Sequence, residues 1–374
     1  MIWLNNAATS FPKPQAVRDC VNACIDHLPC SDGRSSLLAR DALEDARCIA
    51  ASFFGVRKAE RIHFLSGATE AANLIISGLG IGKQAVLATS LEHNCILRPL
   101  FSRLERSQIG IVHPDESGRI PSSAIPSFAG AKFFFLNHSS NVTGAVQDAK
   151  GLFAEAHRLG MACILDFSQT AGTFPVDLDD IEADVAFCAC HKGLLGVPGC
   201  AVMYLRDSSL VKPSFFGGTG EHGDVLDMRN SGVFEVGTMN QAAVSALSCG
   251  ISFIQELGTE KVFGSVSSKV MQIKMELSCL SRIRLASPLE GPCTNAVSFV
   301  IDGISPSDAA FILRDSYQII VRSGLMCAPL AMKDLGLVEG AVRVSPSYLT
   351  TDSEVQSFID AMKDISRSIS RSIE

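Results

Sequence analysis

Hydrophobic and polar positions follow two alternating patterns along most of the chain. Short apolar runs rich in β-branched and aromatic residues end in polar residues, and each run predicts a buried strand. Longer segments between them, such as 68–80 and 148–160, have apolar positions at helical spacing and close on glycine, which suits a helix end. The predicted strands lie within residues 61–67, 84–89, 109–113, 132–139, 162–169, 183–190 and 199–205.

This alternation predicts an α/β fold with a mainly parallel sheet covered by helices. After a long predicted helix within 237–258, the strand candidates become sparser, and they lie at 295–302, 317–323 and 341–347. We therefore expect a large domain at 15–255 and a smaller C-terminal α+β domain at 256–374. Residues 1–14 are expected to pack against the small domain. The absence of a flexible linker predicts that the two domains pack firmly and enclose a cleft.

Composition narrows the class of protein. The chain has 374 residues, of which 47% are hydrophobic, and a net charge of −7, so it lacks the basic footprint of a nucleic-acid-binding protein. We find no signal peptide and no apolar run long enough to cross a bilayer, so we expect neither a membrane partner nor secretion. Thirteen cysteines in a long chain do not resemble a disulfide framework. These features predict a cytoplasmic protein with reduced cysteines.

One group of cysteines has spacing that a soft metal ion could use. It consists of Cys20, Cys24, His27 and Cys30. Cys20 and Cys24 also continue the apolar stripe of a helix that begins after residue 14. We favour this structural reading and expect no metal site.

Polar residues that follow the predicted strands are the first site candidates, because ligands gather at the carboxyl ends of parallel strands. Ala68 and Thr69 begin a helix and offer amides and a hydroxyl to a phosphate. Asp166 follows one buried strand, and Lys192 follows another. Each residue also has an ordinary structural explanation: a helix start for Thr69, a turn or helix cap for Asp166, and a surface position in a glycine loop for Lys192.

Together these residues meet the needs of pyridoxal phosphate. That cofactor requires an amine to hold its aldehyde, a carboxylate near its ring nitrogen and donors for its phosphate. Lys192, Asp166 and Thr69 supply these groups. A carboxylate beside the pyridinium stabilises the charged ring, which makes loss of a proton from a substrate Cα feasible.

At this point the sequence resembles a known family almost from end to end. It is similar to the class V aminotransferase-like, fold-type I pyridoxal phosphate enzymes, and within them to the cysteine desulfurase and selenocysteine lyase group. A fold-type I pyridoxal phosphate transferase is therefore the implied fold. The resemblance is carried by ordered segments at 4–14, 66–74, 91–99, 137–145, 164–172, 191–199, 217–220, 234–240, 321–329 and 342–351.

The resemblance implies roles for the cofactor site. Lys192 looks like the lysine that holds the cofactor as a Schiff base, and Asp166 looks like the partner of the pyridine nitrogen. His93 resembles the histidine that stacks on the ring and shuttles protons, so it is both catalytic and cofactor-binding. The remaining implied cofactor ligands are Ala68, Thr69 and His191 at the phosphate, Gln169 at the phenolate oxygen, and Asn141 beside ring and substrate.

The resemblance also implies substrate contacts and a partner subunit. Arg343 matches the arginine that binds the substrate carboxylate, a task suited to its planar fork, and Asn141 is the second implied substrate ligand. Thr238 matches a residue that reaches the phosphate across a twofold dimer interface. A homodimer is therefore implied.

Cys327 separates the possible reactions. Among thirteen cysteines a lone one is presumed structural, but its setting between Gly324 and Pro329 matches the cysteine that, in desulfurases, accepts sulfur as a persulfide while L-cysteine becomes L-alanine. Nearby arginines would favour its thiolate. The short connection to Arg343 resembles the group in which a separate sulfur-acceptor protein takes the persulfide.

Three departures from the family pattern leave the substrate open. Met326 stands where histidine is common, Ala189 where a phosphate-binding serine is common, and Asn5 where aspartate is common. The alternatives are a selenocysteine lyase or a β-lyase for a cysteine derivative, a plain aminotransferase, and a non-catalytic sulfur-carrier or binding homologue.

Overall fold

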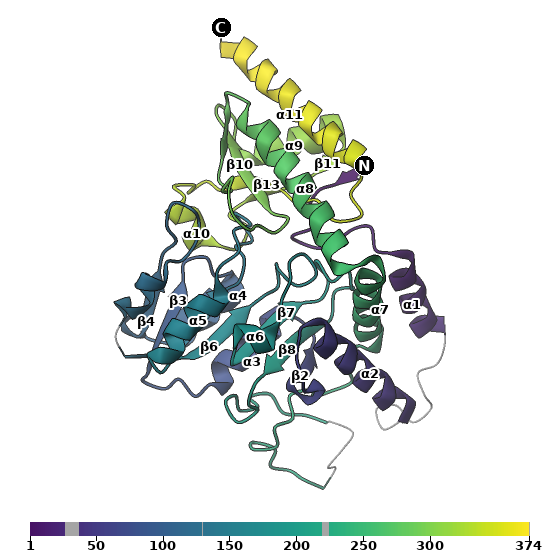
Figure 1. Ribbon diagram of the computed structural model, residues 1–374, viewed down its shortest axis with the longest axis vertical. Coiled ribbons are helices and arrows are strands. Elements are labelled where there is room, and N and C mark those ends of the chain that lie inside the picture. Colours follow the sequence, from purple (N-terminus) through teal and green to yellow (C-terminus); the bar gives the residue numbers. More distant parts are fainter. Residues whose placement is uncertain (27–36, 129, 219–223, 374) are drawn as a thin grey trace.

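A seven-stranded sheet is the centre of the structure. The computed structural model describes residues 1–26, 37–128, 130–218 and 224–373. The sheet has the order β2-β8-β7-β6-β5-β3-β4 (Figure 1); β3 to β7 run parallel to one another, and β8 runs antiparallel to both of its neighbours. The mainly parallel α/β sheet is thus confirmed. Its strands are β2 (Ile62–Leu65), β3 (Ala85–Thr89), β4 (Ile109–Val112), β5 (Ala131–Asn137), β6 (Ala162–Asp166), β7 (Val185–Ala189) and β8 (Ala201–Leu205).

Helices cover both faces of this sheet because successive strand residues point to opposite faces. In β5, Phe134 and Leu136 pack on one side, whereas Phe133 and Phe135 pack on the other. The first side is covered by α2 (Leu37–Phe53), α5 (Ala149–Arg158) and α7 (Gln241–Leu257), with α1 (Gln15–Asp26) packed on α7 and the short α6 (Leu178–Ile181) beside α5. The second side is covered by α3 (Ala68–Gly78) and α4 (Asn94–Arg103). Short 3-10 turns span Ala59–Arg61, Arg106–Gln108 and Ser122–Ser127.

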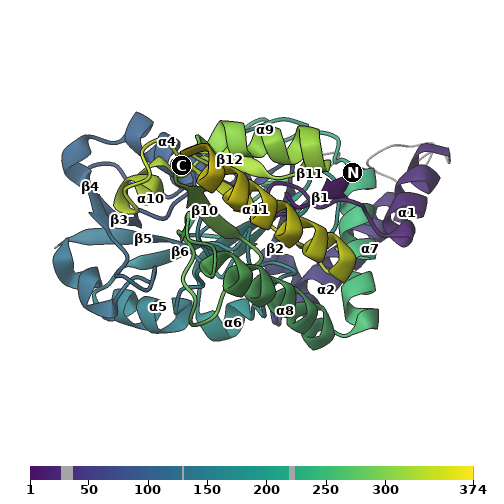
Figure 2. The same ribbon diagram turned by 90° about the horizontal axis from the view of Figure 1, so that it is seen from above.

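A smaller antiparallel sheet lies beyond the large one. Its order is β12-β13-β10-β9, and its core includes Phe299, Ile273 and Phe358. Helices α8, α9 and α11 lie over it (Figure 2). The strands are β9 (Ile283–Leu285), β10 (Val297–Ile301), β12 (Arg322–Gly324) and β13 (Ala341–Val344), and the helices are α8 (Thr259–Ser278), α9 (Pro306–Tyr317), α10 (Pro329–Asp334) and α11 (Asp352–Ile373).

The single strand expected within 317–323 is wrong, because this segment divides at Val321. Its first half, β11 (Ile319–Ile320), pairs in parallel with β1 (Ile2–Trp3), and Leu4 N donates to Ile320 O at 2.9 Å. Its second half, β12, pairs with β13. Main-chain partners supplied by the N-terminal segment therefore decide the break, and the local pattern does not show it.

We propose that the domain boundary lies near residue 255, as the sequence suggests. Helix α7 packs on α1 and α2, whereas α8 packs on α11 and β9. Gly258 separates α7 from α8 with φ of +90°, a left-handed conformation that glycine adopts readily. Residues 1–14 would belong with the smaller part, since Leu4 lies in its core.

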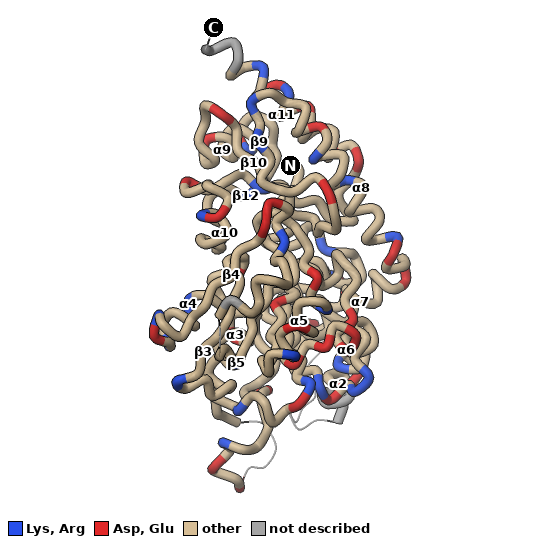
Figure 3. The backbone as a smooth tube through the Cα atoms, turned by 60° about the vertical axis from the view of Figure 1, so that its left-hand side comes forward, with Lys and Arg blue, Asp and Glu red and all other residues tan. Residues whose placement is uncertain are grey.

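Charged residues of both signs are interspersed along the chain (Figure 3). Among the helices in the described ranges, none is both long and apolar enough to cross a membrane.

Candidate active site

A cavity of about 430 Å³ lies at the carboxyl ends of the parallel strands, where residues from the smaller part reach it. It gathers every predicted site residue except Thr238. Residues that we did not assign also line it, including Cys95 and Ser168. The predicted residues in its lining are Ala68, Thr69, His93, Asn141, Asp166, Gln169, His191, Lys192, Cys327 and Arg343.

Thr238 lies apart from the cavity of its own chain. It is exposed in the segment before α7, next to Gly237, which has φ of +85°. Its expected contact belongs to a second subunit, so the contact stays a prediction.

Asp166 ends β6, Lys192 lies in the loop that follows the neighbouring strand β7, and both line the same cavity. Asp166 is buried at the last position of β6; its Oδ1 accepts from Ser168 N at 2.9 Å, and the Cys95 thiol lies 3.9 Å from its Oδ2. Burial lowers the pKa of Lys192, an effect that Asp166 opposes and Arg343 strengthens. The amine therefore loses its proton more readily than a surface lysine does.

His93 is a neutral imidazole held by the start of α4. As the N-cap residue, it accepts a hydrogen bond at Nδ1 from Cys95 N, at 3.1 Å. Burial lowers its pKa to about 4, and the positive charge of Lys192 contributes. Because Nδ1 is an acceptor, the ring proton must reside on Nε2, which leaves that N–H to face the cavity.

Arg343 is a buried guanidinium without a carboxylate partner among the described residues. It is 3% exposed on β13; its Nη1 donates to Asn141 O at 2.7 Å, and its Nη2 donates to Asn5 Oδ1 at 3.3 Å. Burial lowers its pKa to about 10, and repulsion from Arg322 adds to this. A buried positive charge with only neutral partners is a binding site for an anion.

Cys327 lies in a tight turn that is tied to the larger part. Met326 and Cys327 have φ of +52° and +58°, values that side chains other than glycine seldom adopt. Asn94 N donates to Cys327 O at 2.7 Å, and Asn141 Nδ2 donates to Met326 O at 2.7 Å. These bonds hold the strained turn and leave the Cys327 side chain exposed at the cavity.

The N-terminus of α3 forms another wall of the cavity. Gly67 precedes the helix and provides no side-chain cap, so the first-turn amides remain available to an anion. Thr69 lies in the first turn of α3, and His191 lines the same cavity, where burial together with Lys192 lowers its pKa to about 4. Ala189 adds no hydroxyl here.

Unpartnered polar atoms concentrate at this cavity. Asn141 Oδ1, His191 Nδ1 and Arg343 Nε are buried and make no hydrogen bond within the described part of the chain. Buried polar atoms are normally paired, so three such atoms in the lining of one cavity fit a polar ligand. In addition, Gln169 Nε2 donates one hydrogen bond to Ala7 O at 3.1 Å, and its second amide hydrogen can be donated to another acceptor.

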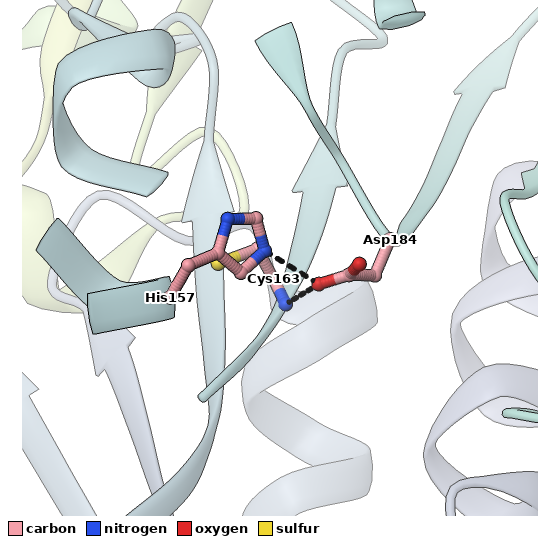
Figure 4. Close-up of side chains that lie close together, drawn as sticks. All are labelled: His157, Cys163 and Asp184. Carbon is pink, nitrogen blue, oxygen red and sulfur yellow. Dashed lines mark hydrogen bonds and ion pairs between the residues drawn. The ribbon is translucent and has the colours of Figure 1, made fainter. Parts of the chain in front are cut away.

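Two other groups of potential metal ligands have simpler explanations. His157, Cys163 and Asp184 lie together near the amino ends of the inner strands β6 and β7 (Figure 4). Asp184 Oδ2 already binds His157 Nε2 at 2.8 Å and accepts from Cys163 N at 2.8 Å. Of the four residues noted in the sequence, Cys20 and Cys24 lie on α1 as expected. His27 and Cys30 lie outside the described residues.

A larger cavity of about 520 Å³ contains none of the predicted site residues. Phe53, Phe174 and Phe263 supply much of its apolar lining. Two of its carboxylates are engaged as helix caps: Asp148 accepts from Gly151 N and Asp177 accepts from Asp180 N. The smaller cavity therefore carries the more reactive set of groups.

Comparison with known proteins agrees with this fold and site. A probable cysteine desulfurase of Methanothermobacter thermautotrophicus is 29% identical over 380 residues, covering 96% of this chain and 94% of the relative. The solved apo structure of a cysteine desulfurase from Thermococcus onnurineus NA1 has a TM-score of 0.87 and 28% identity, covering 98% of this chain and 95% of that one.

A more distant solved structure shares the fold alone. It is a mutant of a protein named C-DES with glycine covalently linked to its PLP cofactor; the TM-score is 0.82 at 18% identity, with coverage of 97% of this chain and 96% of that one. Residues 2–358 of the chain match the family described as Aminotransferase class-V. The resemblance found in the sequence is thereby confirmed, and the protein belongs to the aminotransferase class-V family.

Proposed function

We propose that the protein is a pyridoxal phosphate-dependent cysteine desulfurase that converts L-cysteine to L-alanine and takes the sulfur as a persulfide on Cys327. One observation carries the proposal: a single cavity presents the Lys192 amine, the Asp166 carboxylate and the Cys327 thiol. The similarity to cysteine desulfurases at 28–29% identity over almost the whole chain supports it.

The residues present fit pyridoxal phosphate. Lys192 would hold it, Asp166 would pair with its ring nitrogen, and His93 would lie against the ring. Gln169 has a free amide hydrogen, and the α3 amides, Thr69 and His191 offer donors at the phosphate end. Bound there, the cofactor withdraws electrons from the substrate Cα, which makes its proton removable and the bond to sulfur labile.

Arg343 and Asn141 would orient the substrate. Among the described residues the Arg343 Nε is unpartnered and the other guanidinium nitrogens donate only to neutral oxygens, so a substrate carboxylate would supply the missing counter-charge. Asn141 holds both Arg343 and the main chain of Met326. It thereby fixes the carboxylate site relative to the turn that carries Cys327.

Lys192 and His93 would transfer the protons. The lowered pKa of Lys192 makes its amine a base for the Cα proton. His93 presents Nε2–H as a donor. In the net reaction, L-cysteine and the Cys327 thiol give L-alanine and a Cys327 persulfide, and all atoms balance.

We further propose that the protein is a cytoplasmic homodimer and that it passes sulfur to an acceptor protein. Exposed Phe215, Phe216 and Leu226 precede Thr238 in the segment between β8 and α7, and a second subunit would cover them. The exposed turn of Cys327 would meet the acceptor. The cysteines described in the structure are all free, which suits a reducing compartment.

The test combines an absorbance spectrum with product yields. Purified protein should show the band of bound cofactor and should form equal amounts of alanine and sulfide from L-cysteine with a reductant. Cys327→Ala should keep the band and lose turnover, whereas Cys279→Ala, at another exposed cysteine, should keep both. Unchanged turnover in Cys327→Ala would contradict the assignment.

A further inference from the structure

Lys274 is a buried lysine outside the active site. It lies on α8 and is 1% exposed, and its Nζ donates to Pro288 O at 2.6 Å. Its other partner is Cys293 Sγ, at 3.2 Å. Within the described residues no carboxylate pairs with this ammonium. The amine is therefore held against a thiol in a place where a lysine is costly to bury.

Cys293 is the accessible member of this pair. It is partly exposed between β9 and β10, whereas Lys274 is buried, so a small oxidant from solvent would meet Cys293 before Lys274. The segment around it is fixed to the larger part. Thr294 N donates to Gly144 O at 2.8 Å, and Val146 N donates to Pro292 O at 3.0 Å. The thiol cannot easily swing away from the amine.

We propose that Cys293 is a reversible oxidation site whose oxidised sulfur is captured by Lys274 as a sulfur–nitrogen bond. The oxidant is a hydroperoxide, and the proposal does not depend on the proposed function. Sulfenic acids condense with nearby nitrogen, and the 3.2 Å contact presents the amine nitrogen directly to the sulfur.

The sulfur–nitrogen bond between Cys293 and Lys274 forms in two steps. First, the Cys293 thiol and hydrogen peroxide give a sulfenic acid and water: the peroxide O–O bond breaks, an S–O bond forms, and the sulfur is oxidised. Second, the sulfenic acid and the Lys274 ammonium give the S–N link, water and one proton, as the S–O bond breaks. The released proton enters solvent, so a higher pH favours the second step. Two equivalents of an added thiol restore both side chains and leave as a disulfide.

Local geometry separates Cys293 from the other accessible thiols. Cys279 follows the same helix and is exposed, but none of the described residues gives it a side-chain amine as a partner. Oxidation of Cys279 should therefore continue along the usual series to sulfinic and sulfonic acids. Cys279 serves as the internal control for Cys293.

The test is mass spectrometry of the intact, cofactor-loaded protein after brief treatment with hydrogen peroxide. We expect the peptides of Lys274 and Cys293 to be joined, with a mass about 2 Da below the sum of the reduced peptides. Trypsin should no longer cleave after Lys274, the yield should rise with pH, and dithiothreitol should release both peptides. Once cleavage after Lys274 is blocked, Cys279 lies on the same peptide, so any oxygen that Cys279 gains adds about 16 Da to the joined mass, and fragmentation should place that oxygen on Cys279 and the link on Lys274.

Variants check that the link needs both partners. Lys274→Met replaces the buried amine with an apolar chain of similar length, and it should leave Cys293 to gain oxygen without a link. In Cys293→Ser no link should form. The proposal is overturned if wild-type Cys293 accumulates as an unlinked sulfenic, sulfinic or sulfonic acid, or stays reduced while Cys279 is oxidised.

Discussion

Glu92 is a fully buried carboxyl group directly before His93, and Glu92→Gln tests how its ionisation limits stability. Its Oε1 accepts from Thr89 Oγ1 and from Asn137 N, each at 2.7 Å, whereas Oε2 has no partner among the residues that the structure describes. Glutamine retains Oε1 and both hydrogen bonds. The substitution therefore removes the titration of this group while keeping its contacts.

The size of the effect follows from the pKa of Glu92. Burial raises this pKa from 4.5 to about 8, and repulsion from Asp166 contributes. Because the folded-state pKa lies above the unfolded-state value, the stabilising contribution is complete below about pH 4.5 and is lost as the pH rises through about 8. At about 1.4 kcal/mol per pH unit, roughly 2 kcal/mol of unfolding free energy is lost between pH 6 and 8.

Urea unfolding at pH 6 and pH 8 measures this loss. The free energy of unfolding of the wild type should fall between these pH values by about 2 kcal/mol more than that of Glu92→Gln. Histidines with lowered pKa, such as His63 and His138, occur in both proteins and cancel in the comparison. Glu116→Gln, at an exposed glutamate, should retain the wild-type profile. Parallel profiles for wild type and Glu92→Gln would show that ionisation of Glu92 does not limit stability in this pH range.

Three further predictions concern the cavity. Arg343→Lys loses the planar guanidinium fork and should raise the KM for L-cysteine by about 10- to 100-fold, with a smaller change in kcat. Initial-rate kinetics measures both constants. An unchanged KM would show that Arg343 does not bind the substrate carboxylate. Asp166→Asn should keep the bound-cofactor band and lose alanine formation, because a neutral amide does not stabilise a protonated ring; activity near the wild-type level would contradict the role. Ala189→Ser adds a hydroxyl at the cavity wall and should slow cofactor loss during dialysis, and a faster loss would show that the position has no room for it.

Much of the large sheet was predictable because each of its strands is an apolar run ending in a polar residue. Asp166 ends such a run at the carboxyl edge of the sheet, and the structure places it there, as the sequence indicates. The helix ends were also readable, since Gly80 and Gly160 have φ of +62° and +75° at the expected places.

Long-range contacts were not readable from the pattern. The break at Val321 depends on pairing with the N-terminal strand, which lies more than 300 residues away. The hydrogen bond from Arg343 to Asn141 joins residues 202 positions apart and was not predicted; the resemblance implied only that both residues bind the substrate. Buried polar residues such as Glu92 and Lys274 look like surface positions in a sequence, because burial is decided by the tertiary contacts around them.

The fate of sulfur in a single turnover tests most directly whether Cys327 takes the sulfur from L-cysteine. Protein is mixed with one equivalent of L-cysteine without reductant, and the alanine that forms is quantified. The masses of the cysteine-containing peptides are then measured by mass spectrometry. If Cys327 takes the sulfur, about one alanine should form per site, and the Cys327 peptide should gain about 32 Da, which dithiothreitol should remove. Alanine formed with Cys327 unmodified, or with the sulfur carried by a different cysteine, would contradict this role of Cys327.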